Sequence, residues 1–255
     1  MSWVGFKRAV DRAGTTIRQK TGSVERTVDN KYNEEEARFR NLETKSEDLH
    51  RQARGYAEAA KVMTLAQIDI AKSISEFSDG GGDSSASIRR YLQAMEGLEA
   101  DSREKLSEDF DKAVLEPIGR FCSYFTEVDK TIKKRSRKLL DYDSQRAKVR
   151  KMVDKSVGDR LPQTEAIANQ AREIYEMHNQ QLLEIIPTLV DSRVDVIDPS
   201  FEAMIKAQYQ FVKDAYGRLA AISGDFPPME AQVHIDGRID DLLGQMRGLT
   251  ICGLV

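Results

Sequence analysis

Long apolar runs, cysteines and aromatic residues are all scarce in this chain of 255 residues. No stretch approaches the roughly 18 consecutive apolar residues of a membrane-spanning helix, and no apolar run after the N-terminal charges is typical of a secretory signal peptide. The two cysteines, Cys122 and Cys252, have neither a metal-binding spacing nor the number that a disulfide framework needs, so they suit a reducing compartment. We therefore expect a cytoplasmic protein whose contact with any membrane is peripheral.

Prolines and catalytic motifs are scarce as well. The chain has six prolines, 7% aromatic residues and 32% charged residues, a composition typical of long solvated helices. It contains no phosphate-binding loop, no nucleophile elbow and no HExxH zinc motif, and its three histidines are scattered. No set of ligands indicates a metal or a cofactor. The sequence therefore argues against an enzyme.

What the chain has instead is apolar residues at helical spacing. Over residues 39–77 two rows repeat every seven residues, which is the a/d pattern of a helix in coiled-coil packing. The rows are Leu42, Leu49, Tyr56, Met63, Ile70 and Phe77, and Phe39, Ser46, Ala53, Ala60, Gln67 and Ile74. We expect this helix to end near Ser78, before a loop rich in glycine, aspartate and serine.

Two further long helices are predicted. The second covers about residues 87–157, with a bend at Pro117, and the third covers about residues 162–223, with bends at Pro187 and Pro199. The fold class that follows is all-α: an elongated, antiparallel three-helix coiled coil. Such a unit has few ways to cover its apolar seam alone, so we expect it to dimerise.

One stretch of the second helix is strongly basic. Eleven lysines and arginines but only three acids lie between Lys130 and Lys155, a local charge of about +8 in a chain of net charge −3. Seven of these basic residues share the helix face opposite the apolar seam and are called the basic stripe below. They are Lys130, Lys133, Lys134, Arg137, Lys148, Lys151 and Lys155. Arg135, Arg146 and Arg150 fall on the apolar side, so we expect them to pair with acids of a neighbouring helix or of a partner chain.

A stripe with so few acids predicts a polyanionic ligand. Nucleic acid is disfavoured, because the rest of the chain is acidic, aromatic residues do not interleave with the stripe, and no recognised nucleic-acid-binding motif is present. An anionic phospholipid membrane is the favoured partner. The alternative is a coiled-coil scaffold whose basic face docks an acidic protein.

The first 28 residues form a separate basic amphipathic segment. Such a segment is typical of a helix that lies in a membrane interface, with its apolar side inserted and its basic residues near anionic headgroups. The residues that we expect to contact the membrane are Trp3, Phe6, Lys7, Arg8, Val10, Arg12 and Ile17. The alternative is a helix that docks on the bundle. A short tail helix, over residues 235–246, is also expected to pack back on the bundle.

Several strings of residues resemble the N-BAR family, specifically amphiphysin-like proteins of the fungal Rvs type and their animal bridging-integrator relatives. The strings are Met1–Val10, Lys20-Thr21-Gly22, Lys138-Leu139-Leu140-Asp141-Tyr142-Asp143, Pro187–Arg193 and Pro199-Ser200-Phe201. The resemblance covers essentially the whole chain. It implies a crescent-shaped antiparallel dimer with a six-helix central bundle, and a positive concave face and tips that bind curved anionic membrane. It places Lys133, Lys134, Arg137, Lys148 and Lys151 on that face and Arg160 at the tip.

The resemblance also sets expectations for organisation and partners. A membrane-inserting helix (1–28) would precede a BAR domain (29–225) and a tail with a short helix (226–255). Many relatives carry a C-terminal Src-homology 3 domain, whereas this chain resembles the BAR-only member, so it is expected to form a homodimer or a heterodimer with a relative that has that domain. The implied function is to sense and generate membrane curvature in endocytosis and cortical actin organisation. The implied location is the plasma membrane and cortical actin patches, with endocytic and cortical actin proteins as further partners.

Overall fold

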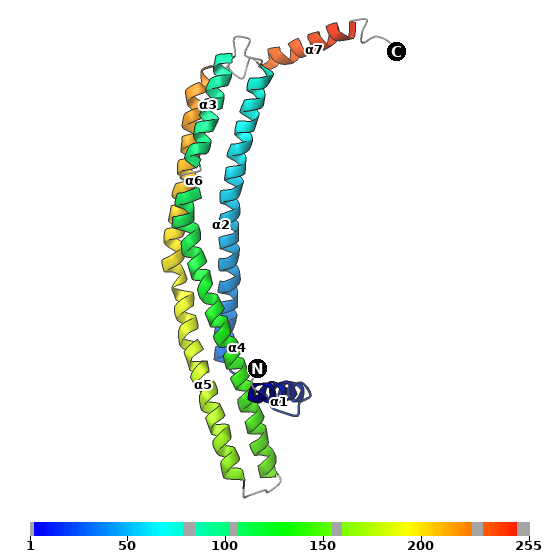
Figure 1. Cartoon of the computed structure of the whole chain (residues 1–255), viewed down its shortest axis with the longest axis vertical. Helices are drawn as coiled ribbons and strands as arrows, with labels where there is room; N and C mark the ends of the chain where they lie inside the picture. The colour runs from blue at the N-terminus through cyan, green and yellow to red at the C-terminus, as the bar shows by residue number, and fades with distance from the viewer. Residues whose placement is uncertain (1–2, 79–84, 103–106, 155–159, 226–231, 249–255) are drawn as a thin grey trace. The chain divides into compact units, whose positions relative to one another are not determined.

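Every element that the structure describes is a helix. The computed structural model describes residues 3–78, 85–102, 107–154, 160–225 and 232–248. The elements are α1 (Trp3–Lys20), α2 (Asn30–Phe77), α3 (Ser85–Ser102), the π-helical turn η2 (Asp111–Leu115), α4 (Glu116–Asp154), α5 (Leu161–Asp191), α6 (Arg193–Ser223) and α7 (Gln232–Gly248) (Figure 1). In these ranges no helix is long and apolar enough to cross a membrane. The predicted all-α fold class is confirmed.

The helices form two units. Unit 1 contains residues 1–55 and 111–204, and unit 2 contains residues 56–110 and 205–255. In unit 1, α4 and α5 lie side by side as an antiparallel hairpin, and α1 lies against α4 (Figure 1). This hairpin and the first half of α2 position the basic stripe.

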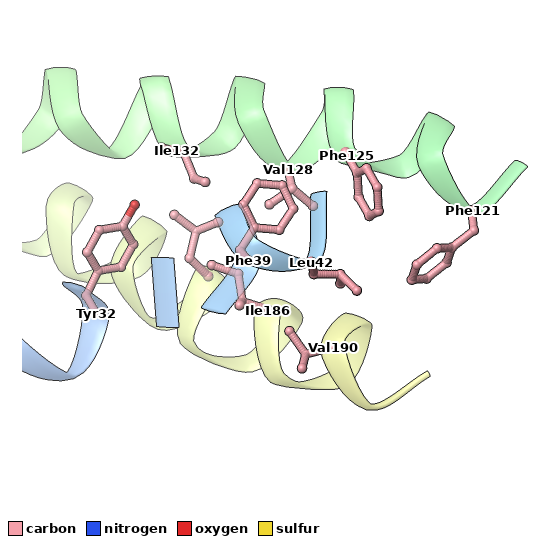
Figure 2. Close-up of a cluster of buried hydrophobic side chains, with 10 residues drawn as sticks. Tyr32, Phe39, Leu42, Phe121, Phe125, Val128, Ile132, Ile186 and Val190 are labelled. Atoms are coloured by element: carbon pink, nitrogen blue, oxygen red, sulfur yellow. The ribbon is translucent and has the colours of Figure 1, made fainter. Parts of the chain in front are cut away.

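Large apolar side chains form the core of unit 1, where α2, α4 and α5 meet (Figure 2). The ring of Phe39 packs edge-on against that of Phe125, with centroids 5.8 Å apart, and Phe125 packs against Phe121 at 5.2 Å. Each side chain of this size contributes about 1.5–3 kcal/mol when it is fully buried. The buried members are Tyr32, Phe39, Leu42, Phe121, Phe125, Val128, Ile132, Leu182, Ile186 and Val190.

The apolar seam predicted along α2 is buried mainly in its first half. In unit 1 the seam residues Phe39, Leu42, Ser46 and Ala53 are buried. In unit 2 the seam residue Ala60 is still buried, together with Thr64, Ile68 and Ala71 from outside the seam, whereas the seam residues Met63, Ile70, Ile74 and Phe77 are exposed. A straight α-helix falls about 20° behind a seven-residue repeat in every heptad, so the predicted rows rotate from the inner to the outer side of α2.

The second predicted helix contains a π-helical turn. Its described parts are α3, η2 and α4, and residues 103–106 and 155–157 of the predicted span lie outside the described ranges. Pro117 has no N–H group, and its ring meets the carbonyl four residues earlier, at Ala113. Ala113 lies within η2, where the wider π-helical turn makes room for that ring. The sequence thus predicted the place of the irregularity but not its form.

The third predicted helix is divided in two, and the tail helix is exposed. α5 and α6 meet at Ser192, between Pro187 and Pro199, the two prolines at which bends were predicted. The N–H of Ser192 still donates to the carbonyl oxygen of Thr188 at 3.0 Å. In α7 every side chain whose burial is described is exposed, so the expectation that the tail helix packs back on the bundle is wrong.

Candidate functional site

Helix α1 is docked on α4 through its polar side. The Arg12 guanidinium donates two hydrogen bonds to the Asp141 carboxylate, from Nε to Oδ1 at 2.8 Å and from Nη2 to Oδ2 at 2.9 Å. Paired bonds of this kind between two charged groups are among the strongest that side chains form. The hydrogen bond to Asp141 also raises the pKa of Arg12. Arg12, predicted to contact the membrane, is therefore engaged within the protein.

The apolar side of α1 is exposed. Trp3, Phe6, Val10 and Ile17 are all more than half exposed, with Trp3 at 78%. The rings of Trp3 and Phe6 stack, with centroids 6.1 Å apart. At 100° per residue these four side chains lie roughly opposite Arg12. Docking on the bundle, the alternative for this segment, thus occurs through one side of the helix, and the apolar side stays accessible.

A tight turn ends α1 and returns the chain toward α4. The N–H of Gly22 donates to the carbonyl of Gln19 at 3.2 Å, and the N–H of Ser23 donates to that of Arg18 at 2.8 Å. This is the Schellman arrangement, and Gly22 supplies its left-handed residue with a φ of 73°. Val24 follows and is buried. Glycine is favoured at this position because residues with a Cβ adopt such a φ only at a cost.

The fully buried carboxylate of Asp143 holds the connection between α1 and α2. Its Oδ1 accepts a hydrogen bond from the Thr27 hydroxyl at 2.6 Å, and its Oδ2 accepts one from Nε2 of Gln19 at 2.8 Å. The guanidinium of Arg146 lies 3.8 Å away and supplies opposite charge. A buried carboxylate needs such partners, because burial without them is costly. Asp143 therefore ties α4 to both ends of this turn.

The three arginines on the apolar side of α4 all contact other segments of unit 1. Arg135 is 4% exposed and donates from Nε to Oδ1 of Asn179 on α5 at 2.7 Å. Arg146 and Arg150 both pair with the carboxylate of Glu25, at 3.9 and 3.4 Å. The acids with which they pair, Asp29 and Glu25, belong to the α1–α2 connection, so the pairing was predicted correctly but the neighbouring element was not.

The basic stripe lies on the exposed side of α4 but is not uniform. Lys130, Lys133, Lys134, Arg137, Lys148 and Lys151 are all exposed, and Lys155 lies outside the described residues. Lys130 pairs with Glu127 at 2.6 Å, and Lys133 lies 4.0 Å from Asp129. The remaining members form no ion pair within the part of the chain that the structure describes, and we call them the unpaired stripe residues. They are Lys134, Arg137, Lys148 and Lys151.

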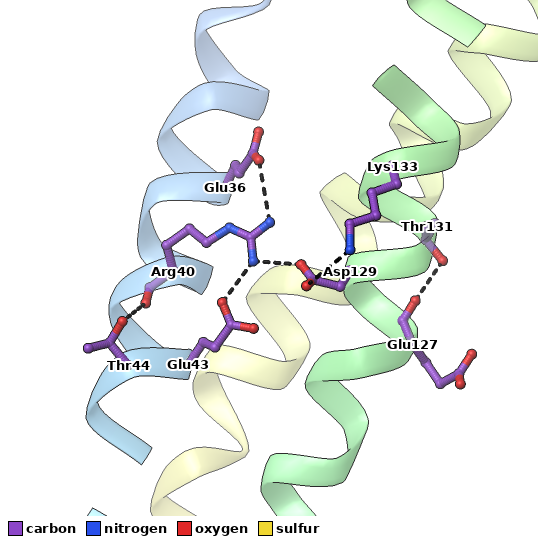
Figure 3. Close-up of polar contacts among 8 residues, drawn as sticks. All are labelled: Glu36, Arg40, Glu43, Thr44, Glu127, Asp129, Thr131 and Lys133. Atoms are coloured by element: carbon purple, nitrogen blue, oxygen red, sulfur yellow. Dashed lines mark hydrogen bonds and ion pairs between the residues drawn. The ribbon is translucent and has the colours of Figure 1, made fainter. Parts of the chain in front are cut away.

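An ion-pair network links the paired end of the stripe to α2 (Figure 3). Nη1 of Arg40 donates to Oδ1 of Asp129 at 2.5 Å and to Oε2 of Glu43 at 2.7 Å, and Glu36 lies 3.9 Å away. Asp129 therefore serves both Arg40 and Lys133. The positive charge of Lys133 is partly compensated, which leaves the unpaired stripe residues as the stronger source of positive potential.

Asp141 lies on the same face of α4 as the basic stripe. It follows Arg137 by four residues and precedes Lys148 by seven, so the three side chains fall within a sector of about 40°. Helix α1 thus crosses α4 between these two members of the stripe, with pockets on both of its sides. From the sequence, Asp141 was one of three acids in the basic stretch and part of the string Lys138–Asp143, with no partner predicted for it. Its spacing from Arg137 and Lys148 places it on the face of the stripe, but nothing in that spacing points to Arg12 as its partner.

The remaining predicted site residue, Arg160, is exposed directly before α5. Its carbonyl oxygen accepts hydrogen bonds from the backbone N–H and the hydroxyl of Thr164. Residues 155–159, which include most of the predicted tip, lie outside the described ranges. Burial raises the pKa of the Cys122 thiol, consistent with a packing role. Among the described residues no cluster of histidine, cysteine, aspartate or glutamate has the arrangement of a metal site.

Comparison with known proteins identifies the family. Residues 6–225 match the BAR domain. The chain belongs to the BAR domain family. BAR membership indicates membrane binding and dimerisation as the general properties of such a protein.

Individual BAR relatives resemble the chain over nearly its whole length. It is 43% identical to "Protein hob3" of Schizosaccharomyces pombe, covering 100% of this chain and 98% of that one. It is 38% identical to "Regulator of cytoskeleton and endocytosis RVS161" of Candida albicans, covering 100% and 99%. The solved amphiphysin BAR domain from Drosophila has a TM-score of 0.61 at 22% identity and covers 79% of this chain and 94% of that one, a likeness of fold.

Proposed function

We propose that this protein binds anionic membranes through the basic stripe and α1, and that as a dimer it senses and generates membrane curvature. The observation that supports this most directly is the position of α1. It crosses the face of α4 that carries the stripe, and it turns Trp3, Phe6, Val10 and Ile17 away from α4. Charge and apolar side chains are thereby available to one lipid surface.

The magnitudes are suited to reversible peripheral binding. A basic residue close to an anionic leaflet contributes about 1 kcal/mol, and burial of apolar surface contributes about 25 cal/mol per Å². The electrostatic contribution comes from the unpaired stripe residues and also from Lys7 and Arg8 of α1. The apolar contribution comes from the apolar side of α1. The electrostatic part is screened over about 8 Å at physiological ionic strength, so binding should weaken strongly in high salt.

A dimer would cover the apolar residues that unit 2 leaves exposed. On α2 these include Met63, Ile70, Ile74 and Phe77, and Phe77 is 93% exposed. On α6 they are Ile205, Tyr209, Val212, Tyr216 and Leu219, at intervals of three and four residues. Apolar surface of this extent is unusual on a monomer. We propose an antiparallel, crescent-shaped dimer with a six-helix central bundle, formed with a second copy or with a BAR relative that has an SH3 domain.

The cellular role is proposed from the relatives. One of them is named a regulator of cytoskeleton and endocytosis. The proposed role of this protein is therefore in endocytosis and cortical actin organisation, in the cytoplasm and peripherally at the plasma membrane and cortical actin patches. Residues 1–28 would act as the membrane-inserting helix, 29–225 as the BAR domain and 226–255 as the tail.

Sedimentation with phosphatidylserine vesicles, followed by electron microscopy, tests this function. We expect wild-type protein to sediment at physiological salt, to be released at high salt and to form tubules. The double variant Lys134→Glu/Arg137→Glu should bind poorly. The matched control is Lys31→Glu/Lys45→Glu, which reverses two exposed charges of α2.

Two results would contradict the proposal. Equal binding by both double variants would show that the stripe is not the lipid-binding face. No sedimentation of the wild type at physiological salt would favour the scaffold alternative, in which the same face docks an acidic protein.

A further inference from the structure

Two of the three acids in the basic stretch of α4 hold the N-terminal segment. Asp141 binds Arg12 of α1, and Asp143 binds Gln19 of α1 and Thr27 of the α1–α2 connection. Each acid lowers the positive charge of a region whose proposed ligand is anionic, so neither favours lipid binding directly. Their contacts indicate a different role.

We propose that Asp141 and Asp143 are positioning residues that keep α1 folded on α4 before any lipid is bound. The consequence for membranes rests on the proposed function, whereas the docking itself is a property of the lipid-free protein. In this arrangement α1 and the basic stripe form one preformed binding surface. The N-terminal segment is then not a free tail that folds only when it meets lipid.

The sequence of α1 explains why these contacts are needed. The helix has 18 residues, which is near the length at which isolated helices are marginal in water, and Gly5 and Gly14 lower its propensity further. The pair of Arg12 and Asp141 supplies two charge-assisted hydrogen bonds between half-buried groups. Asp143 adds a second point of attachment at the C-terminal end of the helix. Attachment at two points fixes both the position and the rotation of α1.

The fixed rotation of α1 determines the direction in which its apolar side faces, and this direction matters for lipid binding. With Arg12 and Gln19 toward α4, the apolar residues of α1 face the opposite way. A segment that folds on a membrane loses conformational entropy at that moment, and this loss opposes binding. A docked helix has lost that entropy already. It therefore presents its apolar side in one direction relative to the stripe and should bind lipid more tightly.

Hydrogen exchange of the α1 amides, followed by mass spectrometry on the full-length lipid-free protein, tests the docking. We expect residues 7–20 to be protected in the wild type. Asp141→Asn should lower this protection at least about tenfold, which corresponds to about 1.4 kcal/mol. The matched control is Asp154→Asn, which removes the third acid of the same stretch, exposed at the end of α4, and should leave protection unchanged. Equal exchange in all three proteins would overturn the proposal.

Vesicle tubulation tests the positioning role. Both variants gain one unit of positive charge, so electrostatics alone predicts that both bind phosphatidylserine vesicles at least as well as the wild type. Positioning predicts that Asp141→Asn forms about tenfold fewer tubules while Asp154→Asn does not lose activity. Equal tubulation by the two variants would overturn the role. If the wild type failed to bind vesicles, the proposed function would fall, and the exchange result would still decide whether α1 is docked.

A charge swap tests the ion pair itself. Arg12→Asp should lose protection and tubulation, and Arg12→Asp/Asp141→Arg should recover both, because the pair is re-formed in reverse. No recovery in either measurement would overturn the role of this pair. Asp143→Asn should behave like Asp141→Asn, with circular dichroism as a check on folding because the residue is buried. The half-buried Asp141 keeps the proposal testable if the Asp143 variant does not fold.

Discussion

The two units of the molecule differ in the size of the apolar side chains that α2 buries in each of them. Unit 1 buries Phe39, Phe121 and Phe125 and carries the basic stripe on its surface. Unit 2 buries smaller side chains of α2, such as Ala60 and Ala71, and leaves many of its larger apolar residues exposed. Unit 2 also has a core of its own, in which Met95, Leu98 and Phe110 are buried. The difference therefore indicates that association would add apolar burial to unit 2 along α2 and α6.

The contrast is visible within the single helix α2. Its first half places large residues inward, and its second half places them outward, because a regular helix rotates relative to the seven-residue repeat. One apolar pattern therefore supplies a core in unit 1 and an association surface in unit 2. Mutations along α2 should accordingly have two kinds of effect, one on folding and one on assembly.

The largest effect is expected from the core of unit 1. Phe39→Ala or Phe125→Ala should lower the free energy of unfolding by about 3–5 kcal/mol, because each leaves a cavity in a packed aromatic cluster. Denaturant unfolding followed by circular dichroism measures this change. Tyr124→Ala, on the exposed side of α4, is the control and should change stability by less than about 0.5 kcal/mol. Similar losses in both would mean that the cluster is not the main source of stability.

Substitutions on the exposed apolar side of α6 in unit 2 should weaken dimerisation. Val212→Glu/Tyr216→Glu should weaken the dimer at least about 100-fold, or about 2.7 kcal/mol, because charge enters an apolar interface. Analytical ultracentrifugation measures the dissociation constant, and helix content should be retained in the variant. Ala221→Glu, exposed on the other side of α6, is the matched control. An unchanged dimer in the double variant would remove this surface from the proposed interface.

Removal of positive charge from the basic stripe of unit 1 should lower the affinity for anionic vesicles. Lys148→Gln/Lys151→Gln should lower affinity for phosphatidylserine vesicles by about 2 kcal/mol, since each lost charge removes about 1 kcal/mol. Lys130→Gln/Lys133→Gln should cost less, because Glu127 and Asp129 already compensate those charges. Sedimentation at two salt concentrations measures both. A larger loss from the paired residues would reverse the order that the ion pairs predict.

The smallest effects are expected at two glycines with opposite signs. Gly22→Ala should destabilise the turn after α1 by about 1 kcal/mol, because the new side chain disfavours the left-handed conformation. Gly55→Ala, in the interior of α2 with open space around its Cα, should stabilise the helix by up to about 1 kcal/mol. Thermal unfolding measures the stability of each variant, and hydrogen exchange of residues 18–24 shows whether the turn after α1 is affected. The same sign at both positions would contradict the role assigned to Gly22.

Periodicity and charge pattern predicted the features that depend on one helix. They predicted the end of α2 near Ser78, the exposure of the stripe residues that the structure describes, and the inward position of Arg135. These follow from residue spacing on a regular helix, which the local sequence determines.

Features that depend on contacts between segments were not predictable in the same way. The docking of α1 joins residues 129 positions apart, and nothing local marks Asp141 as its partner. The π-helical turn before Pro117 and the break at Ser192 are backbone adjustments to packing and sterics, for which residue spacing has no signal. The exposure of α7 shows that an amphipathic pattern does not by itself specify what the helix packs against.

The fluorescence of Trp3 can report on lipid contact at the start of α1. The chain has a single tryptophan, so selective excitation of the indole reports on one place, the exposed start of α1. Transfer of that ring from water into lipid shifts its emission to shorter wavelengths without any attached label. Because Trp3 lies nine residues before Arg12, its emission should follow lipid contact, while the amides around Arg12 follow attachment to α4. Insertion and docking can therefore be timed independently in the unmodified chain.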